Sequence, residues 1–275
     1  MLKEYSFDNI YIRQAVDEQP DDSDFTMHIH EQCEIYFFVS GNVEYLVEGS
    51  RYPLDENSLM IIRPAEAHKP RITGSEKYER YAVNFPLSFA DSIDPRGELT
   101  KAFTERPLGK NNMFSYSEID MKLVSRLFSE MCSDGDDYNR QLTIKTHLIM
   151  LLDIISRAFA GKGDGEYNPP STAERIVAYV NNHLYDTISV DKLAEHFYLS
   201  QSQFSRVFRQ ATGAAPWEYI TKKRLTAAKE KIRSGSSAQN AAESCGFGDY
   251  SNFYRAYIKH FGYAPTNDNT KFRKN

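Results

Sequence analysis

The chain has 275 residues, and its hydrophobic content of 41% is enough apolar material for two packed cores. No stretch approaches the roughly 18 consecutive apolar residues of a membrane span, so we expect a soluble, cytoplasmic protein without membrane contact. Its three cysteines, Cys33, Cys132 and Cys245, form no close pair, which argues against a disulfide framework or a zinc knuckle.

Charge is divided unevenly along the chain. Residues 1–170 hold 18 Lys and Arg against 29 Asp and Glu, whereas residues 171–275 hold 15 against 9. The net charges of the two parts are therefore −11 and +6. A basic part joined to an acidic part favours a polyanionic partner for the basic part alone, although two ordinary solvated surfaces can also differ in this way.

The first part of the chain has the pattern of a β-domain. Short runs of β-branched and aromatic residues at 36–39, 43–47 and 59–62 are separated by turn-forming residues. Strands this short, broken so often by turns, predict an antiparallel sandwich or barrel, to which we assign residues 1–115.

Helical spacing replaces this pattern in residues 116–160, which we expect either to cover the barrel or to form a dimer contact. A glycine- and proline-rich linker is predicted at 161–170. The residues placed on the buried faces of the two helices before it are Ile119, Leu123, Leu127, Met131, Leu142, Ile144, Leu148, Leu151, Leu152 and Ile155.

Residues 171–275 have helical patterns almost throughout and contain an internal repeat. The pattern Phe-x-Arg-x-Phe-x4-Gly-x2-Pro at 204–216 returns 49 residues later, with Tyr in place of the second Phe, at 253–265. A short helix and a turn precede each copy, with the small residues Ala194 and Ala242 where two helices would cross closely. Each copy therefore predicts a helix, a tight turn and a second helix.

The second helix of each copy combines a buried apolar stripe with an outer face of hydroxyl, amide and arginine groups. Arginine can bind guanine through two hydrogen bonds, and Asn or Gln can bind adenine in the same way. A generic helical repeat with solvated arginines is the alternative, and two copies in register on a basic domain argue against it. The predicted base-facing residues are Gln201, Ser202, Ser205, Arg206, Arg209, Tyr250, Ser251, Asn252, Tyr254 and Arg255.

A long helix between the two copies, opened by Pro216, is predicted to hold them at a fixed separation. We assign its residues Lys222, Lys223 and Lys229 to phosphate contacts, which orient a protein on DNA without determining sequence. We expect Arg224, on the same helix, to be an internal salt-bridge partner.

With these features, residues 171–275 resemble the DNA-binding domain of the AraC/XylS family of bacterial transcription regulators. The resemblance implies two helix-turn-helix units in successive major-groove segments, a homodimer and, most often, activation; RNA polymerase is a further candidate partner. The family usually has an aromatic residue and an arginine soon after Pro265, whereas Phe272 and Arg273 come later here, so the last helix is expected to be shifted or frayed. The residues that carry the resemblance are Leu193, Ala194, Phe204, Ser205, Arg206, Val207, Phe208, Gly213, Pro216, Tyr219, Arg224, Ala227, Ala228, Ala241, Ala242, Cys245, Gly246, Phe247, Asn252, Phe253, Arg255, Gly262 and Pro265.

The β-domain contains a group of residue types that bind metals. His28 and His30 are two residues apart, which places both on one face of a strand, and Glu34 and His68 follow. This pattern resembles the cupin signature, in which such residues bind a divalent metal inside a small β-barrel. The second half of the signature is imperfect, because the spacing from Pro64 to His68 is one residue short and the usual glycine is absent.

Three roles for these histidines stay open: binding a divalent metal, hydrogen bonding to a polar effector, and a purely structural role. We expect no cofactor other than such a metal. Aromatic rings beside imidazole and carboxylate groups suit a hydroxylated metabolite such as a carbohydrate. The predicted effector-binding residues are His28, His30, Glu34, Tyr36, Phe38, Tyr45 and His68.

The predicted architecture is thus multidomain: an N-terminal all-β, cupin-like barrel with flanking helices and a C-terminal all-α domain with two helix-turn-helix motifs. The predicted function is sequence-specific regulation of transcription, controlled by a small polar metabolite and without enzymatic activity. The alternative is a metal-dependent cupin enzyme, a dioxygenase or isomerase, fused to a DNA-binding domain. A DNA-repair methyl acceptor would need a cysteine cluster, and an architectural DNA-binding protein would be basic throughout.

Overall fold

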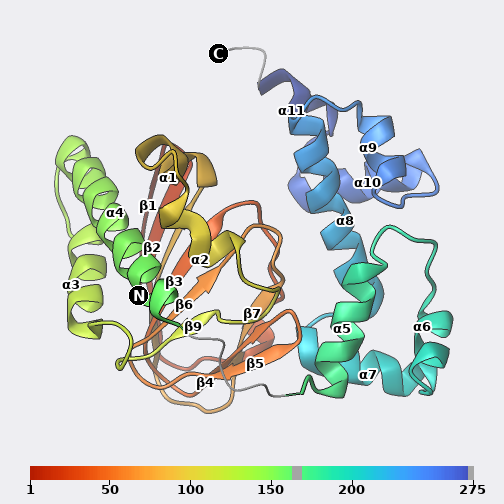
Figure 1. Cartoon of the computed structure of the whole chain (residues 1–275), viewed down its shortest axis with the longest axis horizontal. Coiled ribbons are helices and arrows are strands. Elements are labelled where there is room, and N and C mark those ends of the chain that lie inside the picture. Colours follow the sequence, from red (N-terminus) through yellow and green to blue (C-terminus); the bar gives the residue numbers. More distant parts are fainter. Residues whose placement is uncertain (163–168, 272–275) are drawn as a thin grey trace.

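The computed structural model describes residues 1–162 and 169–271 (Figure 1). Most of the predicted linker at 161–170, and both Phe272 and Arg273, lie outside the described residues. The β-rich part and the helical part form two lobes that lie side by side (Figure 1).

The described strands form two antiparallel sheets. One has six strands in the order β1-β2-β8-β3-β6-β9, and the other has three in the order β5-β4-β7. The strands are β1 (Leu2–Phe7), β2 (Ile10–Asp17), β3 (Cys33–Ser40), β4 (Val43–Val47), β5 (Ser50–Pro53), β6 (Ser58–Ile62), β7 (His68–Ile72), β8 (Tyr78–Phe85) and β9 (Met113–Phe114).

The two sheets enclose one hydrophobic core and present a second core to the helices. Side chains alternate between the faces of a strand, so Tyr36 and Phe38 of β3 point between the sheets while Ile35 and Phe37 point to the outer face. The three predicted apolar runs lie in or overlap β3, β4 and β6, which confirms the predicted β-domain. A short helix, η1 (Asp22–Asp24), lies between β2 and β3, and three more lie between β8 and β9: α1 (Leu87–Ile93), η2 (Glu98–Thr100) and α2 (Lys101–Thr104).

Helices α3 (Met121–Met131) and α4 (Asp137–Gly161) cover the outer face of the six-stranded sheet (Figure 1). The carboxylates of Asp120 and Asp136 cap their first turns. One predicted buried residue is wrong: Leu142 is 54% exposed. Leu142 lies two residues before the buried Ile144, which corresponds to a rotation of roughly 200° around the helix axis. The two side chains therefore point to opposite sides of the helix.

The C-terminal part is helical, and the predicted repeat is confirmed as two helix-turn-helix units, α6–α7 and α9–α10. Ser200 and Asp249 cap α7 and α10, and Gly213 and Gly262 end them in the left-handed conformation with a φ of 78° in both. The helices are α5 (Thr172–Asn182), α6 (Val190–His196), α7 (Gln201–Thr212), α8 (Pro216–Arg233), α9 (Ala238–Ser244), α10 (Tyr250–Phe261) and α11 (Thr266–Lys271).

Each helix-turn-helix unit has its own core, and α8 contributes to both. Phe204 and Phe208 pack with α5, α6 and the first half of α8, whereas Phe253 and Tyr257 pack with α9 and the second half of α8. The last helix, α11, begins directly after Pro265, and Asp268 fixes it to this core by accepting hydrogen bonds from Tyr257 and Arg233. The expected shift or fraying is therefore not seen at residues 266–271. Helix α8 therefore sets the separation of the two units.

Candidate DNA interface and effector cavity

The second helices of the two units, α7 and α10, present the polar faces that the repeat predicts. The buried aromatic stripe of each helix turns the opposite face outward. Nine of the ten predicted base-facing residues are exposed, and Ser205 is half-buried. On α10, the guanidinium of Arg255 donates to the amide oxygen of Asn252 at 2.6 Å, so these two side chains are held side by side.

The three lysines of α8 that we assigned to phosphate contacts face the β-domain instead. Lys223 is buried, with its Nζ 2.6 Å from Glu48 Oε1, and Lys222 Nζ donates to the carbonyl oxygen of Met27 at 3.2 Å. Lys229 Nζ pairs with a β-domain carboxylate at 3.2 Å. The phosphate-contact assignment is therefore wrong for this arrangement, because the β-domain covers the face of α8 that carries these amines.

Arg224 is internal, as predicted, but it makes no salt bridge in the described part of the chain. Its guanidinium donates to the carbonyl oxygens of Leu184, Asp186 and Gly246 at 2.6 to 2.8 Å. These carbonyls belong to the turns after α5 and after α9. Arg224 therefore fixes α8 to a turn near each helix-turn-helix unit.

Glu48, in the turn between β4 and β5, connects the two lobes. It is buried, and its carboxylate accepts hydrogen bonds from Asn181 Nδ2 at 2.7 Å, from the Tyr219 hydroxyl and from Lys223 Nζ. It also accepts from the backbone amide of Ala67 at 2.7 Å. One carboxylate of the β-domain thus binds α5 and α8 together.

A groove of about 550 Å³ separates α7 from the β-domain. Arg206 and Arg209 line it on the α7 side, and Lys69 and Arg71 line it on the other side. Lys69 pairs with Asp22 at 2.9 Å, and Arg71 also pairs with a carboxylate. Among the described residues neither α7 arginine has an acidic partner, so both are available to a polyanion.

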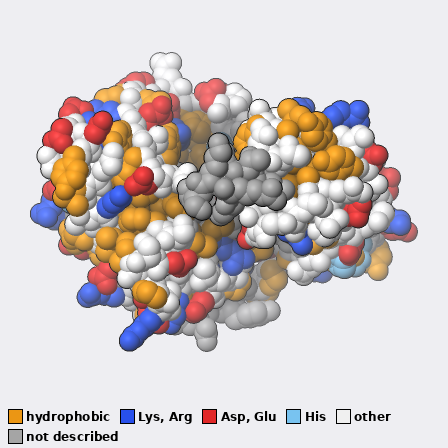
Figure 2. Space-filling model, turned by 90° about the horizontal axis from the view of Figure 1, so that it is seen from above, with side chains coloured by type: hydrophobic (Ala, Val, Ile, Leu, Met, Phe, Trp, Pro, Cys, Tyr) orange, Lys and Arg blue, Asp and Glu red, His pale blue; other side chains and the backbone are white. Residues whose placement is uncertain are grey.

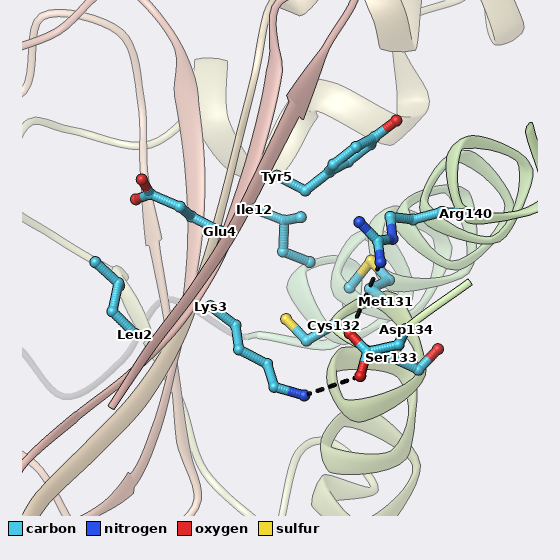
Figure 3. A pocket seen from close by; sticks show the side chains of 10 residues that line it. All are labelled: Leu2, Lys3, Glu4, Tyr5, Ile12, Met131, Cys132, Ser133, Asp134 and Arg140. Carbon is cyan, nitrogen blue, oxygen red and sulfur yellow. Dashed lines mark ion pairs between the residues drawn. The ribbon is translucent and has the colours of Figure 1, made fainter. Parts of the chain in front are cut away.

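On the face shown in Figure 2, the acidic and basic side chains of the described residues are interspersed. A further pocket of about 340 Å³ lies between β1 and the turn after α3 (Figure 3). Its cations Lys3 and Arg140 both lie within 3.9 Å of Asp134, and burial raises the pKa of its Cys132 thiol to about 11. Both cations therefore face one exposed carboxylate, and we assign this pocket no ligand.

A cavity of about 150 Å³ lies between the two sheets of the β-domain. Six of the seven predicted effector-binding residues line it. Phe38 does not line the cavity. It lies two residues after Tyr36 on β3 and is fully buried, and its ring centroid lies 6.2 Å from that of Tyr78. The lining residues are Tyr11, Arg13, Phe25, His28, His30, Glu34, Tyr36, Tyr45, His68, Pro70, Tyr78, Arg80, Ala82 and Asn84.

The sequence reasoning missed the contributions of β2 and β8 to this cavity. Alternate residues of β8, from Tyr78 to Asn84, and of β2, Tyr11 and Arg13, line it. Their period of two was visible in the sequence. That β8 pairs with β3, and β2 with β8, was not, because it depends on the pairing of distant segments.

His30, Glu34 and His68 form a tight cluster in the cavity wall. Glu34 Oε2 lies 2.9 Å from His30 Nε2 and 3.6 Å from His68 Nε2. Burial alone would raise the pKa of Glu34, but the hydrogen bonds from both histidines hold it well below its usual value. For His68, the adjacent carboxylate overcomes the effect of burial and raises the pKa. Glu34 therefore stays ionised.

These three residues fit a divalent metal. Their ligand atoms all lie within 4.8 Å of one another, and the ligands of a tetrahedral site are roughly 3.3 Å apart. The carbonyl oxygens of Gln32 and Glu66 accept from Nδ1 of His30 and His68, which directs Nε2 of each ring toward Glu34. The fourth predicted ligand, His28, lies outside this cluster, so the predicted metal set reduces to three residues.

Two family models match the chain. A model described as an AraC-like ligand binding domain matches residues 14–152, and one described as a helix-turn-helix domain matches residues 193–270. The chain belongs to the AraC family. Among the described residues, no helix combines the length and the apolar character that crossing a membrane requires.

Proteins similar to this AraC-family chain match it along most of their length. The probable transcriptional regulator LumQ of Photobacterium leiognathi is 27% identical over 89% of this chain and 92% of its own. The transcriptional activator RhaS of Escherichia fergusonii is 25% identical over 88% and 86%. The solved structure of ToxT from Vibrio cholerae, 10% identical, covers 94% of this chain and 97% of its own with a TM-score of 0.40.

The chain is therefore a DNA-binding transcription regulator with a ligand-binding domain, and it is not an enzyme. The alternative of a metal-dependent cupin enzyme is overturned, because the matched families and the curated relatives are those of transcriptional regulators.

Proposed function

We propose that this AraC-family regulator is an activator controlled by a small polar metabolite bound in the cavity between the two sheets. The observation that carries the proposal is the lining itself, in which imidazole, carboxylate, amide, phenol and guanidinium groups converge on one space. A volume of about 150 Å³ suits a compact molecule. Aromatic rings beside hydrogen-bonding groups favour a hydroxylated one, such as a carbohydrate.

For DNA, we propose that α7 and α10 enter successive major-groove segments. The residues that would face the bases are Gln201, Ser202, Ser205, Arg206, Arg209, Tyr250, Ser251, Asn252, Tyr254 and Arg255. The exposure of nine of these ten residues, on two like helices fixed to α8, supports this assignment. Arg206 and Arg255 occupy equivalent positions in the two helices and are the residues best suited to bind guanine.

We further propose the domain organisation 1–115, 116–160, 161–170 and 171–275 for the effector domain, helical region, linker and DNA-binding domain. Tyr138, Leu142 and Met150 are exposed on α4, which supports a homodimer contact through the helical region. RNA polymerase is a further proposed partner, and the cytoplasm is the proposed location, since both follow from activation of transcription.

We propose that the effector acts on DNA binding through the contacts that the cavity wall makes with α8. Lys222 Nζ donates to the carbonyl oxygen of Met27, and the next residue along the chain lines the cavity. Glu48 accepts from the amide of Ala67, and the next residue, His68, also lines it. A ligand that binds one arrangement of these segments better than another would shift how α8 is held.

We propose that the cluster of His30, Glu34 and His68 also binds a divalent metal. Titration of the full chain with Co²⁺ should then give one equivalent with a d–d absorption spectrum, and His68→Ala should lower the affinity by tenfold or more. His147→Ala, which removes a histidine paired with Glu130 on the helical hairpin, is the matched control. Equal Co²⁺ affinity in wild type and His68→Ala would exclude this site.

The proposed function is tested by mixing the purified protein with sheared DNA of its own organism, with and without a metabolite extract, and sequencing what is retained. A sequence-specific regulator should retain a few discrete fragments that share two blocks about one helical turn apart, and the extract should change the amount retained. Uniform retention of all fragments would contradict the proposed reading of bases by α7 and α10.

A further inference from the structure

The charged side chains of the effector cavity are paired with one exception. Glu34 is bound by two histidines, and Arg80 pairs with Asp17 while its guanidinium lies over the ring of Tyr78. Arg13 of β2, which lines the same cavity, makes no ion pair with any carboxylate in the described part of the chain. One positive charge at the cavity is thus left without a counter-ion.

Strand register places this charge on the inner face of the sheet. Arg13 lies opposite Ala82 of β8, which in turn lies opposite Tyr36 of β3, so the three residues form one row across the sheet. On its other side Arg13 faces Glu4 of β1, but that carboxylate is exposed and accepts the hydrogen bond of the Tyr11 hydroxyl at 2.7 Å.

The electrostatics of the cavity agree with this placement. Burial raises the pKa of Tyr78 to about 12, and the positive charges of Arg80 and Arg13 oppose that rise. Burial likewise holds the pKa of Tyr45 well above its usual value, against the charge of Arg13. Arg13 therefore acts on phenols from both sheets, as expected of a guanidinium that faces the space between them.

Arg13 is half-buried and its side chain interacts with the phenol of Tyr11, which carries no charge to balance it. A bound carboxylate would supply both a counter-ion and two charge-assisted hydrogen bonds. We propose that the effector is a small hydroxylated carboxylic acid, of the sugar-acid class, whose carboxylate binds Arg13. Its hydroxyl groups would face Asn84 and the phenols and imidazoles of the cavity. This inference rests on the proposed function, because it assumes that the cavity is the effector site.

The test compares acids with neutral molecules of the same skeleton by calorimetry on the full chain: glycerate with glycerol, erythronate with erythritol, and galacturonate with galactose. Because a hydrogen bond to a charged group is stronger than one between neutral groups, we expect at least one acid to bind tenfold or more tightly than its neutral partner. Arg13→Gln should abolish that preference, and Arg13→Lys should retain part of it. Arg71→Gln, at an ion-paired arginine outside the cavity, is the matched control and should retain it fully.

A second measurement needs no knowledge of the effector. The component of a metabolite extract that changes DNA retention should bind to an anion-exchange resin at neutral pH, and Arg13→Gln should respond to it at least tenfold less sensitively. Activity in the unbound fraction, or acids that bind no better than their neutral partners, would overturn the carboxylate assignment.

Failure of this inference and failure of the proposed function give different results. Ala82→Phe fills the cavity from its wall. If Ala82→Phe abolishes the response to extract while the active component is neutral, the cavity is the effector site and the carboxylate is wrong. If Ala82→Phe responds as the wild type does, the cavity itself is not the effector site.

Discussion

Replacing either Arg206 or Arg255 by alanine is expected to weaken binding to a retained DNA fragment by about 1–3 kcal/mol, which is roughly 5- to 150-fold. Both guanidiniums lie on the exposed faces of second helices and lack an acidic partner among the described residues. Loss of a base contact should also relax the sequence preference at one position in the corresponding block. Fluorescence anisotropy with the retained fragment, and with variants of each base pair, measures both effects.

Lys231→Ala is the control for these substitutions. Lys231 is exposed near the end of α8 and lies on neither second helix, so its removal should leave the sequence preference unchanged. If Arg206→Ala and Arg255→Ala both bound the fragment as tightly as the wild type, the proposed docking of α7 and α10 would be wrong.

Replacing Glu48 by alanine is expected to lower the free energy of unfolding by about 3–5 kcal/mol, because it leaves the buried amine of Lys223 without a counter-ion. The hydroxyl of Tyr219 and the amide of Asn181 lose their shared acceptor as well. Denaturant unfolding measures the loss. Amide hydrogen exchange should show weaker protection in α8, where the β-domain no longer holds the helix.

The matched control is Glu44→Ala on the neighbouring strand β4. Glu44 pairs with Arg71 at 3.2 Å, but both side chains are partly exposed, and such pairs contribute about 0–1 kcal/mol. Equal stability of Glu48→Ala and Glu44→Ala would show that the carboxylate of Glu48 does not hold the two lobes together. With the contact loosened, Glu48→Ala should also lose most of the effect of the extract on DNA binding.

The helix-turn-helix units could be predicted from the sequence because the signals that define them are local. Capping residues such as Ser200 and Asp249, the apolar stripe of each second helix and the glycine after it all lie within about 15 residues. Two copies in register made the pattern specific. The outer faces of α7 and α10 follow directly from it, since the side that is not buried must face outward.

The lysines of α8 show what local patterns leave out. Their charge and spacing are those of a phosphate-binding helix, and nothing nearby in the sequence shows that Glu48, some 175 residues earlier, pairs with Lys223. The lining of the cavity could likewise be predicted only in part. Alternation placed Glu34 and Tyr36 in its wall, but Arg13 could be added only once β2 was known to pair with β8.

We propose that a metabolite in the cavity of the β-domain controls sequence-specific DNA binding by the two helix-turn-helix units. The most direct measurement is a titration of a retained DNA fragment with wild type and Ala82→Phe, each with and without metabolite extract. We predict that both proteins bind the fragment equally without extract and that only the wild type changes its affinity when extract is added. An equal response in both proteins would contradict the claim.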